Sequence, residues 1–403
     1  MLRRLLADHI ASSADLVWRV AVVVSFGASI LKSGGLGGIL GQLEWNILQF
    51  GPILLATVSI ASQRDRAILR KGDSVLAWAL AAFVAAALLS TISSISRQTT
   101  IFQSGILALM TAFVVLTFTR RWNRRECVES DLLLIFAVIV ANQFLGLSAG
   151  ILGAKWAVGD YSRFVGTLSN ANYAGMLSAT GLAIGFYFVL RMRGRYRFGI
   201  GSAMAILVIS LLWSGSRGSV VAVCVGAVLV LVLLRAWRVL AASLVVLAAL
   251  VAGFLAFAPA LLSRVSSGDL TSGRVAIYEA MLRNWAHSPI LGTGFRTTEL
   301  IPGNNGLAGH DIFLSVLSET GVVGILAFLL TLVAVVVCGR RNTLAGAAAT
   351  VVGIELTESS IYGWGGPTAT LAWLVLIGYA ALGRFTAVDD GTPARRVDVS
   401  TSD

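Results

Sequence analysis

The chain has 403 residues, of which 57% are hydrophobic and 13% are charged. Soluble proteins carry about 25% charged residues, so this composition excludes an ordinary soluble enzyme. The apolar residues form repeated runs near the ~20 residues that a helix needs to cross ~30 Å of hydrocarbon. Backbone groups in lipid must be bonded within their own segment, and helices meet that requirement. The sequence therefore predicts an all-α, polytopic membrane protein.

The net charge of +11 comes from 31 Lys and Arg against 20 Asp and Glu. These charges lie in short clusters between apolar runs, and no basic domain is present that would hold a duplex or an RNA, so we expect no nucleic-acid partner. The three cysteines, Cys127, Cys224 and Cys338, are too far apart in the sequence for a local metal site, and no HExxH motif occurs. We expect neither a metal nor another cofactor.

The apolar runs predict twelve transmembrane helices that form a single domain over residues 1–383, with membrane lipids around it. The spans are near 16–31, 46–62, 74–94, 101–119, 131–149, 172–190, 198–214, 218–234, 239–259, 312–338, 343–361 and 365–383. Arg3 and Arg4 precede a stretch that charged residues interrupt, which indicates an uncleaved first anchor rather than a signal peptide. Residues 384–403 are predicted to form a disordered cytoplasmic tail.

The loop charges test this topology, because short cytoplasmic loops hold the excess of Lys and Arg. Of the 31 basic residues, 21 fall on one side if the spans alternate, which places both termini in the cytoplasm. Two outer loops are long, at about 150–171 and 260–311. Nine basic residues oppose the bias and need a separate reason to be outside: Lys32, Arg97, Lys155, Arg163, Arg217, Arg264, Arg274, Arg283 and Arg296. An anionic ligand on the outer face would supply that reason.

The end of the first long loop mixes a cation with amides. Arg163, Asn170 and Asn172 suit the recognition of a sugar or a phosphate, although either asparagine would also cap the next helix. Arg217 lies in a WSGSRGS turn between two apolar runs of about 16 residues, too short to cross the membrane fully. We therefore expect a recessed turn with Arg217 at or below the headgroups, where an ionisable residue is a candidate for function, unless it only reaches for lipid phosphates.

The second long loop contains a helix-like pattern from Ser272, which predicts an amphipathic interfacial helix that ends at Ser288-Pro289. Arg274 lies at the start of this helix, where free backbone N–H groups favour anions. His310 follows near the next span and is the best general base in the chain, because a neutral imidazole removes protons near neutral pH. Asp311 is expected to cap the helix or to bind substrate. Glu358 is expected to be a counter-ion for the outer arginines or an acceptor for sugar hydroxyls.

Taken together, these residues resemble the bacterial O-antigen ligase and polymerase superfamily. The motifs are Arg163-x-x-Gly166-x-x-x-Asn170-x-Asn172, Ser216-Arg217-Gly218, Gly273-Arg274-x-x-x-Tyr278, Pro289-x-x-Gly292-x-Gly294, His310, and Glu319-x-Gly321-x-x-Gly324. Their order and spacing agree with that superfamily from Arg163 to the end of the tenth span. The chain departs from it at Asp311, where the family usually has Asn, at Ala171, where it often has Pro, and at Tyr278, where Trp is more frequent.

The resemblance implies a metal-independent, inverting membrane glycosyltransferase of the C-type architecture in the bacterial inner membrane. It would move a glycan from undecaprenyl diphosphate to a hydroxyl acceptor. By position, Arg217 and Arg274 would hold the diphosphate with help from Arg163, and His310 would activate the acceptor at a periplasmic site. Further substrate contacts are expected from Asn170, Asn172, Ser216, Tyr278, Asp311, Glu319 and Glu358.

Ligase and polymerase remain open at this point. A ligase would use lipid A core as acceptor in lipopolysaccharide biosynthesis, whereas a polymerase would use another lipid-linked repeat. The compact outer loops favour the ligase slightly. The competing class is a lipid-linked sugar transporter or flippase, which usually has an internal repeat and charges at mid-membrane. The ionisable residues of this chain instead gather at the predicted outer ends, which favours an enzyme.

Overall fold

A computed structural model describes residues 13–33, 42–62, 71–159, 162–168, 170–236, 274–301, 309, 311–339, 342–356, 358 and 367–389. These residues form an α-helical bundle, and the only strand-like pairing among them is an isolated bridge between Val158 and Phe164. The predicted all-α membrane architecture is therefore confirmed. The helices are α2 (Ser13–Ser33), α3 (Gln42–Ala61), α4 (Lys71–Leu89), α5 (Arg97–Leu116), α6 (Arg125–Ile151), α7 (Ala171–Arg191), α8 (Gly194–Ser214), α9 (Arg217–Leu233), α12 (Arg274–His287), α13 (Ile312–Gly339), α14 (Ala345–Glu355) and α15 (Pro367–Asp389).

Each predicted span except 239–259, which lies outside the described residues, coincides with a helix. Within the described ranges, six helices are long and apolar enough to cross a membrane by length and composition: α4 with its 3₁₀ extension, α5, α6, α7, α8 and α13. α14 departs from the prediction, because its 11 residues reach only about 16 Å. The predicted span 343–361 is therefore wrong as a full crossing, since the helix ends at Glu355.

Two other boundaries differ from the prediction. α8 has 21 residues and reaches about 31 Å, which is long enough to cross the membrane. The expectation of a recessed turn before Arg217, which rested on a run of about 16 residues, therefore loses its support from the length of α8. The helix extends into Arg195 and Arg197 because their long side chains carry the charge away from the hydrocarbon. α15 continues to Asp389, past the predicted end of the domain at 383.

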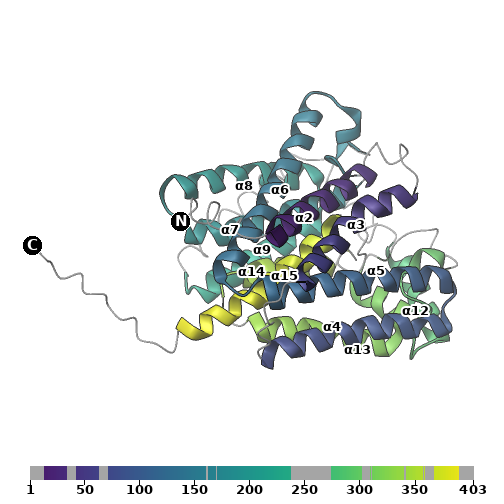
Figure 1. Cartoon of the computed structure of the whole chain (residues 1–403). Coiled ribbons are helices and arrows are strands. Elements are labelled where there is room, and N and C mark those ends of the chain that lie inside the picture. Colours follow the sequence, from purple (N-terminus) through teal and green to yellow (C-terminus); the bar gives the residue numbers. More distant parts are fainter. Residues whose placement is uncertain are drawn as a thin grey trace, which may run out of the picture.

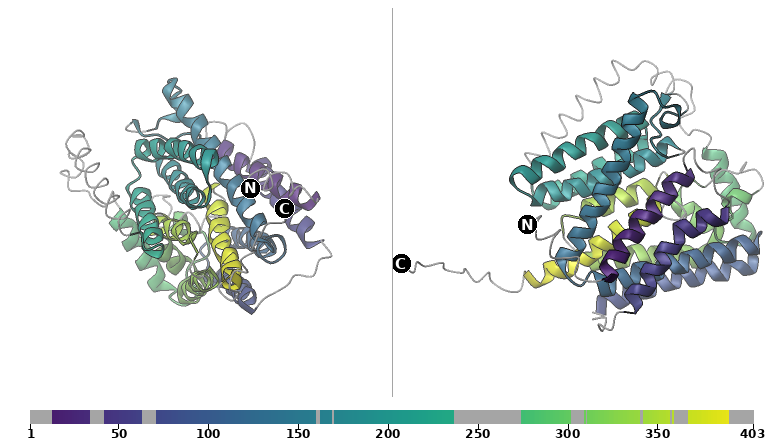
Figure 2. Two further views of the ribbon diagram at one scale, coloured as in Figure 1. Left: turned by 90° about the vertical axis from the view of Figure 1, so that its left-hand side faces the viewer. Right: turned by 45° about the horizontal axis from the view of Figure 1, so that its top comes forward.

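α15 lies in the middle of the bundle. Its residues from Leu371 to Leu382 are almost all buried, and it contacts α13, α14, α6, α2, α7 and α5. α4, α5 and α13 run together along one flank, while α7, α8, α9 and α14 pack on the other (Figure 1). Figure 2 shows α15 enclosed by the other helices when the molecule is viewed end-on. The polar side chains gather at the helix ends and form two separate layers, one at each end of the bundle.

One layer is built around Asp131, whose side chain is fully buried. Arg121 donates to both carboxylate oxygens, from Nε at 2.7 Å and Nη2 at 2.8 Å, and the Trp122 indole donates at 2.9 Å. Arg121 also pairs with Asp15 at the start of α2, and Arg19 lies 3.5 Å from Asp131. The charge pattern predicts a cytoplasmic loop at Arg121, whereas the structure buries this arginine in an ion network.

Further contacts bring the predicted cytoplasmic arginines to this same end. Arg120 donates to the carbonyls of Ile60 and Ala61 at the end of α3. Arg191 at the end of α7 lies 3.2 Å from Glu129 at the start of α6, and Arg384 of α15 donates to Phe118 O at 2.9 Å. Arg120, Arg121, Arg191 and Arg384, all of which the charge pattern assigns to the cytoplasmic side, thus lie at one end of the bundle, which we call the Arg121 end.

We predict that Asp131→Asn will lower the stability of the bundle by about 1.5–3 kcal/mol, the usual range for lost hydrogen bonds to charged groups. The amide keeps the shape but removes the charge that balances Arg121 in a buried position. Thermal unfolding of the purified protein in detergent measures the effect. Glu126→Gln is the matched control, since Glu126 is exposed on the same helix, and an Asp131→Asn variant as stable as this control would contradict the assignment.

Candidate functional site

The first long loop is packed onto the end of α8. Phe164 is fully buried and stacks against Trp213 with ring centroids 5.5 Å apart. Phe164 N donates to Trp213 O at 3.2 Å, and the Trp213 indole donates to Ser162 O at 2.9 Å. Gly166 adopts a φ of 64° and lies against Gly146 of α6. A Cβ on Gly146 would lie 2.7 Å from the Cα of Gly166. These contacts hold Arg163 in a fixed position between α8 and α7.

A continuous chain of polar contacts begins at Arg163. Its Nε donates to Ser214 O at 2.7 Å, and its Nη2 donates to Asn172 Oδ1 at 2.8 Å. Asn172 Nδ2 donates to Glu358 Oε1 at 2.8 Å, and Arg274 Nη2 donates to the same carboxylate oxygen at 3.0 Å. Residues separated by as many as 186 positions are therefore joined through a single carboxylate. Four of the predicted site residues come together here.

Three helix starts converge on this chain of contacts. Asn170 caps α7, and its Oδ1 accepts from Asn172 N at 2.8 Å. α9 begins at Arg217 and α12 begins at Arg274. Ser216, just before α9, lies against Gly175 of α7, where a Cβ would come within 2.4 Å of the Ser216 Cβ. Helix starts carry partial positive charge, so the three ends add to the guanidinium charges at one place.

Arg217 is level with Glu358 because α9 and α14 pack antiparallel. Gly226 would contact Gly346 and Thr350 if it had a Cβ, and Gly353 lies against Ala222. Following this register toward the start of α9 brings Arg217 beside the segment that continues from α14 to Glu358. Arg217 is exposed, and among the described residues it has no hydrogen bond or ion pair. The guanidinium of Arg163, by contrast, spans two protein contacts.

Ser216 has a structural role in this turn. It is 4% exposed, its Oγ lies 2.8 Å from Ser219 Oγ, and its N–H points to Ser214 Oγ at 3.3 Å. Gly215 takes a left-handed conformation with φ of 62° that ends α8. The predicted substrate contact of Ser216 remains a prediction, whereas its contribution to the tight α8–α9 turn is direct.

The glycine motifs of the second long loop form an interlocking joint with α13. α13 is interrupted at Gly321, where φ is 65° and ψ is −165°. The Val322 and Val323 N–H groups released by this break donate to Pro289 O at 2.9 Å and Ile290 O at 3.3 Å. A Cβ on Gly321 would lie 2.2 Å from Ile290 O, so only glycine allows the loop to insert. The two motifs are therefore one structural unit.

Glu319 holds the other part of this loop. It is 1% exposed, and its carboxylate accepts from Arg296 N at 2.5 Å, from Thr298 N at 2.9 Å and from the Thr298 hydroxyl. The sequence predicted a substrate contact for Glu319. The carboxylate stabilises the loop after α12 by accepting from its backbone N–H groups, which need acceptors, and its substrate contact remains a prediction.

The segment around the predicted base is anchored next to α12. Asp311 caps α13, since its Oδ1 accepts from Leu314 N at 2.8 Å. Gly309 lies against Ser315 and against Met281 of α12. His310 itself lies outside the described residues. Its two neighbours in the chain are therefore fixed beside the helix that begins with Arg274.

Tyr278 lies one turn after Arg274 on α12 and is half-buried. Burial raises the pKa of the Tyr278 phenol above its ordinary value, and the neighbouring Arg274 guanidinium partly opposes this shift. The phenol therefore stays protonated near neutral pH and can donate a hydrogen bond.

Two features of this end were missed in the sequence. Asn284 of α12 donates to Thr293 Oγ1 at 2.5 Å and to Ser318 Oγ at 3.4 Å, which ties α12 to the interlocking loop.

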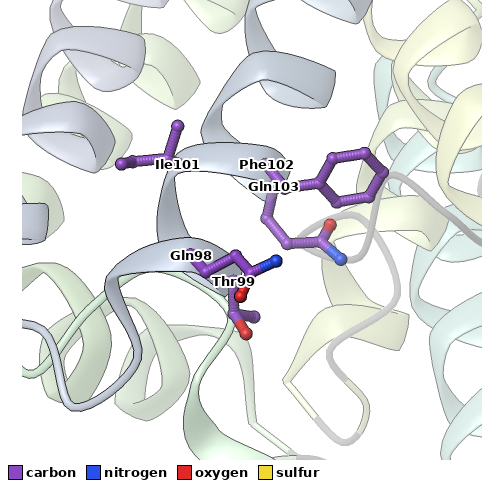
Figure 3. A pocket seen from close by; sticks show the side chains of 5 residues that line it. All are labelled: Gln98, Thr99, Ile101, Phe102 and Gln103. Atoms are coloured by element: carbon purple, nitrogen blue, oxygen red, sulfur yellow. The ribbon is translucent and has the colours of Figure 1, made fainter.

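A hollow of about 780 Å³ lies at the start of α5, lined by Gln98, Thr99, Ile101, Phe102 and Gln103 (Figure 3). It is at the same end, because Thr100 donates to Phe295 O at 3.3 Å. The sequence offered one signal for the first feature, since Asn284 is a polar residue inside an amphipathic helix. It offered no signal for the hollow.

Within the described residues, no group of three or more His, Cys, Asp or Glu is placed to hold a metal ion. The class of protein that fold and site define is an all-α membrane protein with a cationic site at one end of the bundle. Residues 202–329 match the family model described as O-antigen ligase. No curated protein sequence matches the chain significantly. The family match confirms the predicted resemblance over α8, α9, α12 and the start of α13, while Arg163, Asn172 and Glu358 lie outside the matched segment and join it through the contacts above.

Proposed function

We propose that this protein is a membrane glycosyltransferase that transfers a glycan from undecaprenyl diphosphate to a hydroxyl acceptor. The match to the O-antigen ligase family supports a ligase or polymerase type of membrane function. The observation that carries the finer proposal is the polar chain from Arg163 through Asn172 and Glu358 to Arg274, with Arg217 exposed beside it. Three helix starts and these arginines favour a ligand with several negative charges.

The diphosphate would act as the leaving group. As the bond from the anomeric carbon to the diphosphate oxygen breaks, negative charge develops on that oxygen, and fixed guanidinium groups stabilise it without reorganisation. Arg217 and Arg274 would contact the phosphates, because arginine offers a planar fork that matches phosphate oxygens. Arg163 and Asn172 would position Glu358, which in turn orients Arg274. His310 would remove the acceptor proton while the acceptor oxygen attacks the opposite face, which inverts the anomeric configuration.

The same reasoning gives an orientation in the membrane. The Arg121 end holds Arg120, Arg121, Arg191 and Arg384 and would face the cytoplasm, so the site would face the periplasm and both termini would lie in the cytoplasm of a bacterial inner membrane. A flippase is disfavoured by the position of the site, because Arg217 and Arg274 each begin a helix and Arg163 contacts the end of α8, whereas alternating access needs a site near mid-membrane.

Ligase and polymerase share this donor chemistry, and the acceptor separates them. We expect the purified protein, incubated with an undecaprenyl-diphosphate-linked repeat and lipid A core, to form a glycan joined to the core. Elongated lipid-linked chains formed without core would instead identify a polymerase. Absence of both products, with donor still bound, would contradict an enzymatic function.

A further inference from the structure

We infer that the apolar cavity between α7, α8, α9 and α14 binds the polyprenyl chain of the donor lipid, an inference that rests on the proposed function. The cavity has a volume of about 180 Å³. Its walls include Phe186 of α7, Met204 of α8, Cys224 and Ala227 of α9, and Thr350 of α14. Three of these helices, α7, α8 and α14, lead to residues of the polar chain of contacts, and α9 begins at Arg217, so the cavity lies within the bundle below the arginines.

The cavity exists because two helix pairs separate below a shared turn. α9 packs mainly against α14 and α8 mainly against α7, whereas α8 and α9 make few contacts with each other. Small residues on the facing surfaces, Ala183, Ala227 and Gly346, leave the space open. α8 and α9 are joined by the turn at Gly215 and Ser216, and the cavity lies farther along both helices, at Met204 and at Val223 to Val230.

The cavity is suited to hydrocarbon rather than to water. Its lining is apolar except for the Thr350 hydroxyl, which donates to Gly346 O at 2.9 Å, and the weakly polar Cys224 thiol. A water in such a place would find too few hydrogen-bond partners. An apolar cavity of roughly 150 Å³ stays dry and accepts a molecule of the size of benzene, which is close to one five-carbon isoprene unit.

The position of the cavity along α9 fits a chain whose headgroup is held by Arg217. The lining residues from Val223 to Val230 follow Arg217 by 6 to 13 residues, which corresponds to roughly 9–20 Å along the helix. A lipid diphosphate bound by the arginines must send its chain into the membrane from that point. The branched methyl groups of a polyprenyl chain would fill the irregular space left by the small residues, which a straight acyl chain would leave partly empty.

Photolabelling tests the occupant directly. The purified protein is incubated with a polyprenyl diphosphate that carries a diazirine in its third isoprene unit and no sugar, and labelled peptides are mapped by mass spectrometry. We expect labels on α7, α8 and α9 around the cavity, and competition by unlabelled polyprenyl diphosphate but not by phosphatidylglycerol. Equal labelling by a diazirine on a phosphatidylglycerol acyl chain, with no competition by polyprenyl diphosphate, would identify an ordinary lipid site and overturn the inference.

Ala227→Leu fills the cavity, and Cys224→Phe fills it from an adjacent position if the first variant folds poorly. Each buried CH₂ group contributes about four-fold in affinity, so displacement of an isoprene unit should lower labelling and kcat/KM for the full-length donor at least about ten-fold. A donor with a single isoprene unit should be affected much less. Ala205→Leu is the matched control, because Ala205 is exposed on α8 beside Met204.

The two proposals fail in different ways. Labelling of the cavity without any glycan transfer would contradict the proposed function and leave the lipid site standing. Transfer at an unchanged rate in Ala227→Leu, together with no labelling around the cavity, would contradict the lipid site and leave the proposed function standing.

Discussion

Replacing Arg274 with alanine should lower kcat/KM for glycan transfer by about 10²–10³, the loss typical when one preorganised group that stabilises transition-state charge is removed. Arg274 is placed at the first residue of α12 and is oriented by Glu358 at 3.0 Å. Its side chain is 26% exposed, so the guanidinium is partly dehydrated while still open to a ligand. Donor binding, measured with a fluorescent polyprenyl diphosphate, should weaken in parallel.

Two further variants separate a role in the phosphate site from a structural role. Arg274→Lys should restore the ion pair with Glu358 but only part of the rate, because lysine lacks the bidentate fork. Arg283→Ala removes an arginine from the same helix, where it is 70% exposed and lies 3.7 Å from Glu279. Exposed ion pairs of this kind contribute little, so its rate should match the wild type. Unchanged donor affinity in Arg274→Ala would exclude Arg274 from the phosphate site.

The helices followed from the sequence because lipid imposes simple requirements. A run of apolar residues in hydrocarbon must be helical, and its length is set by the membrane, so α5, α6, α7 and α13 appeared near their predicted ranges. The helix that begins with Arg274 was also predictable, because its apolar residues recur at helical spacing. The end of α14 was misplaced, because the predicted span 343–361 continued across the polar residues Thr357, Glu358, Ser359 and Ser360, whereas the helix ends at Glu355.

The site was predictable as a set of residues and not as a geometry. Nine basic residues oppose the charge bias of the membrane, and the sequence motifs around Arg163, Arg217 and Arg274 distinguish these three without any knowledge of contacts. The partners of Arg163 are a backbone carbonyl on α8 and an amide on α7, and such long-range pairs depend on how the helices pack. Glu319 shows the same limit, since its sequence motif gave no sign that its carboxylate would be occupied by the N–H groups of Arg296 and Thr298.

The Arg121 end illustrates a different failure of sequence reasoning. Basic residues in a predicted cytoplasmic loop are normally explained by topology alone. Here Arg121 is 8% exposed and bonded to a fully buried Asp131. Its burial depends on Asp15 and Trp18, which are more than 100 residues away. A charge that the topology already explains can therefore also be part of the core.

Replacing His310 with alanine should lower the rate of transfer by roughly 10²–10⁴, the range for loss of a general base, while donor binding stays unchanged. The reason is that the imidazole would act on the acceptor hydroxyl and not on the diphosphate. Rate and binding are measured separately, by product formation and by the fluorescent polyprenyl diphosphate. His287→Ala is the matched control, because His287 is exposed at the end of α12 and its Nδ1 contacts only Arg283 O, at 2.7 Å, among the described residues.

The pH profile adds a second readout for His310. A neutral imidazole is the active form, so the wild-type rate should rise with pH through the titration of the histidine and then level off, whereas the residual rate of His310→Ala should lack this step. Asp311→Asn keeps the α13 cap, because asparagine caps helices as well as aspartate does. The substitution removes a negative charge next to His310 in the chain. Loss of this charge disfavours the protonated imidazole, so the step in the pH profile should move to lower pH. A wild-type rate in His310→Ala, or a pH step that survives in that variant, would remove His310 from the mechanism and leave the arginine site without its base.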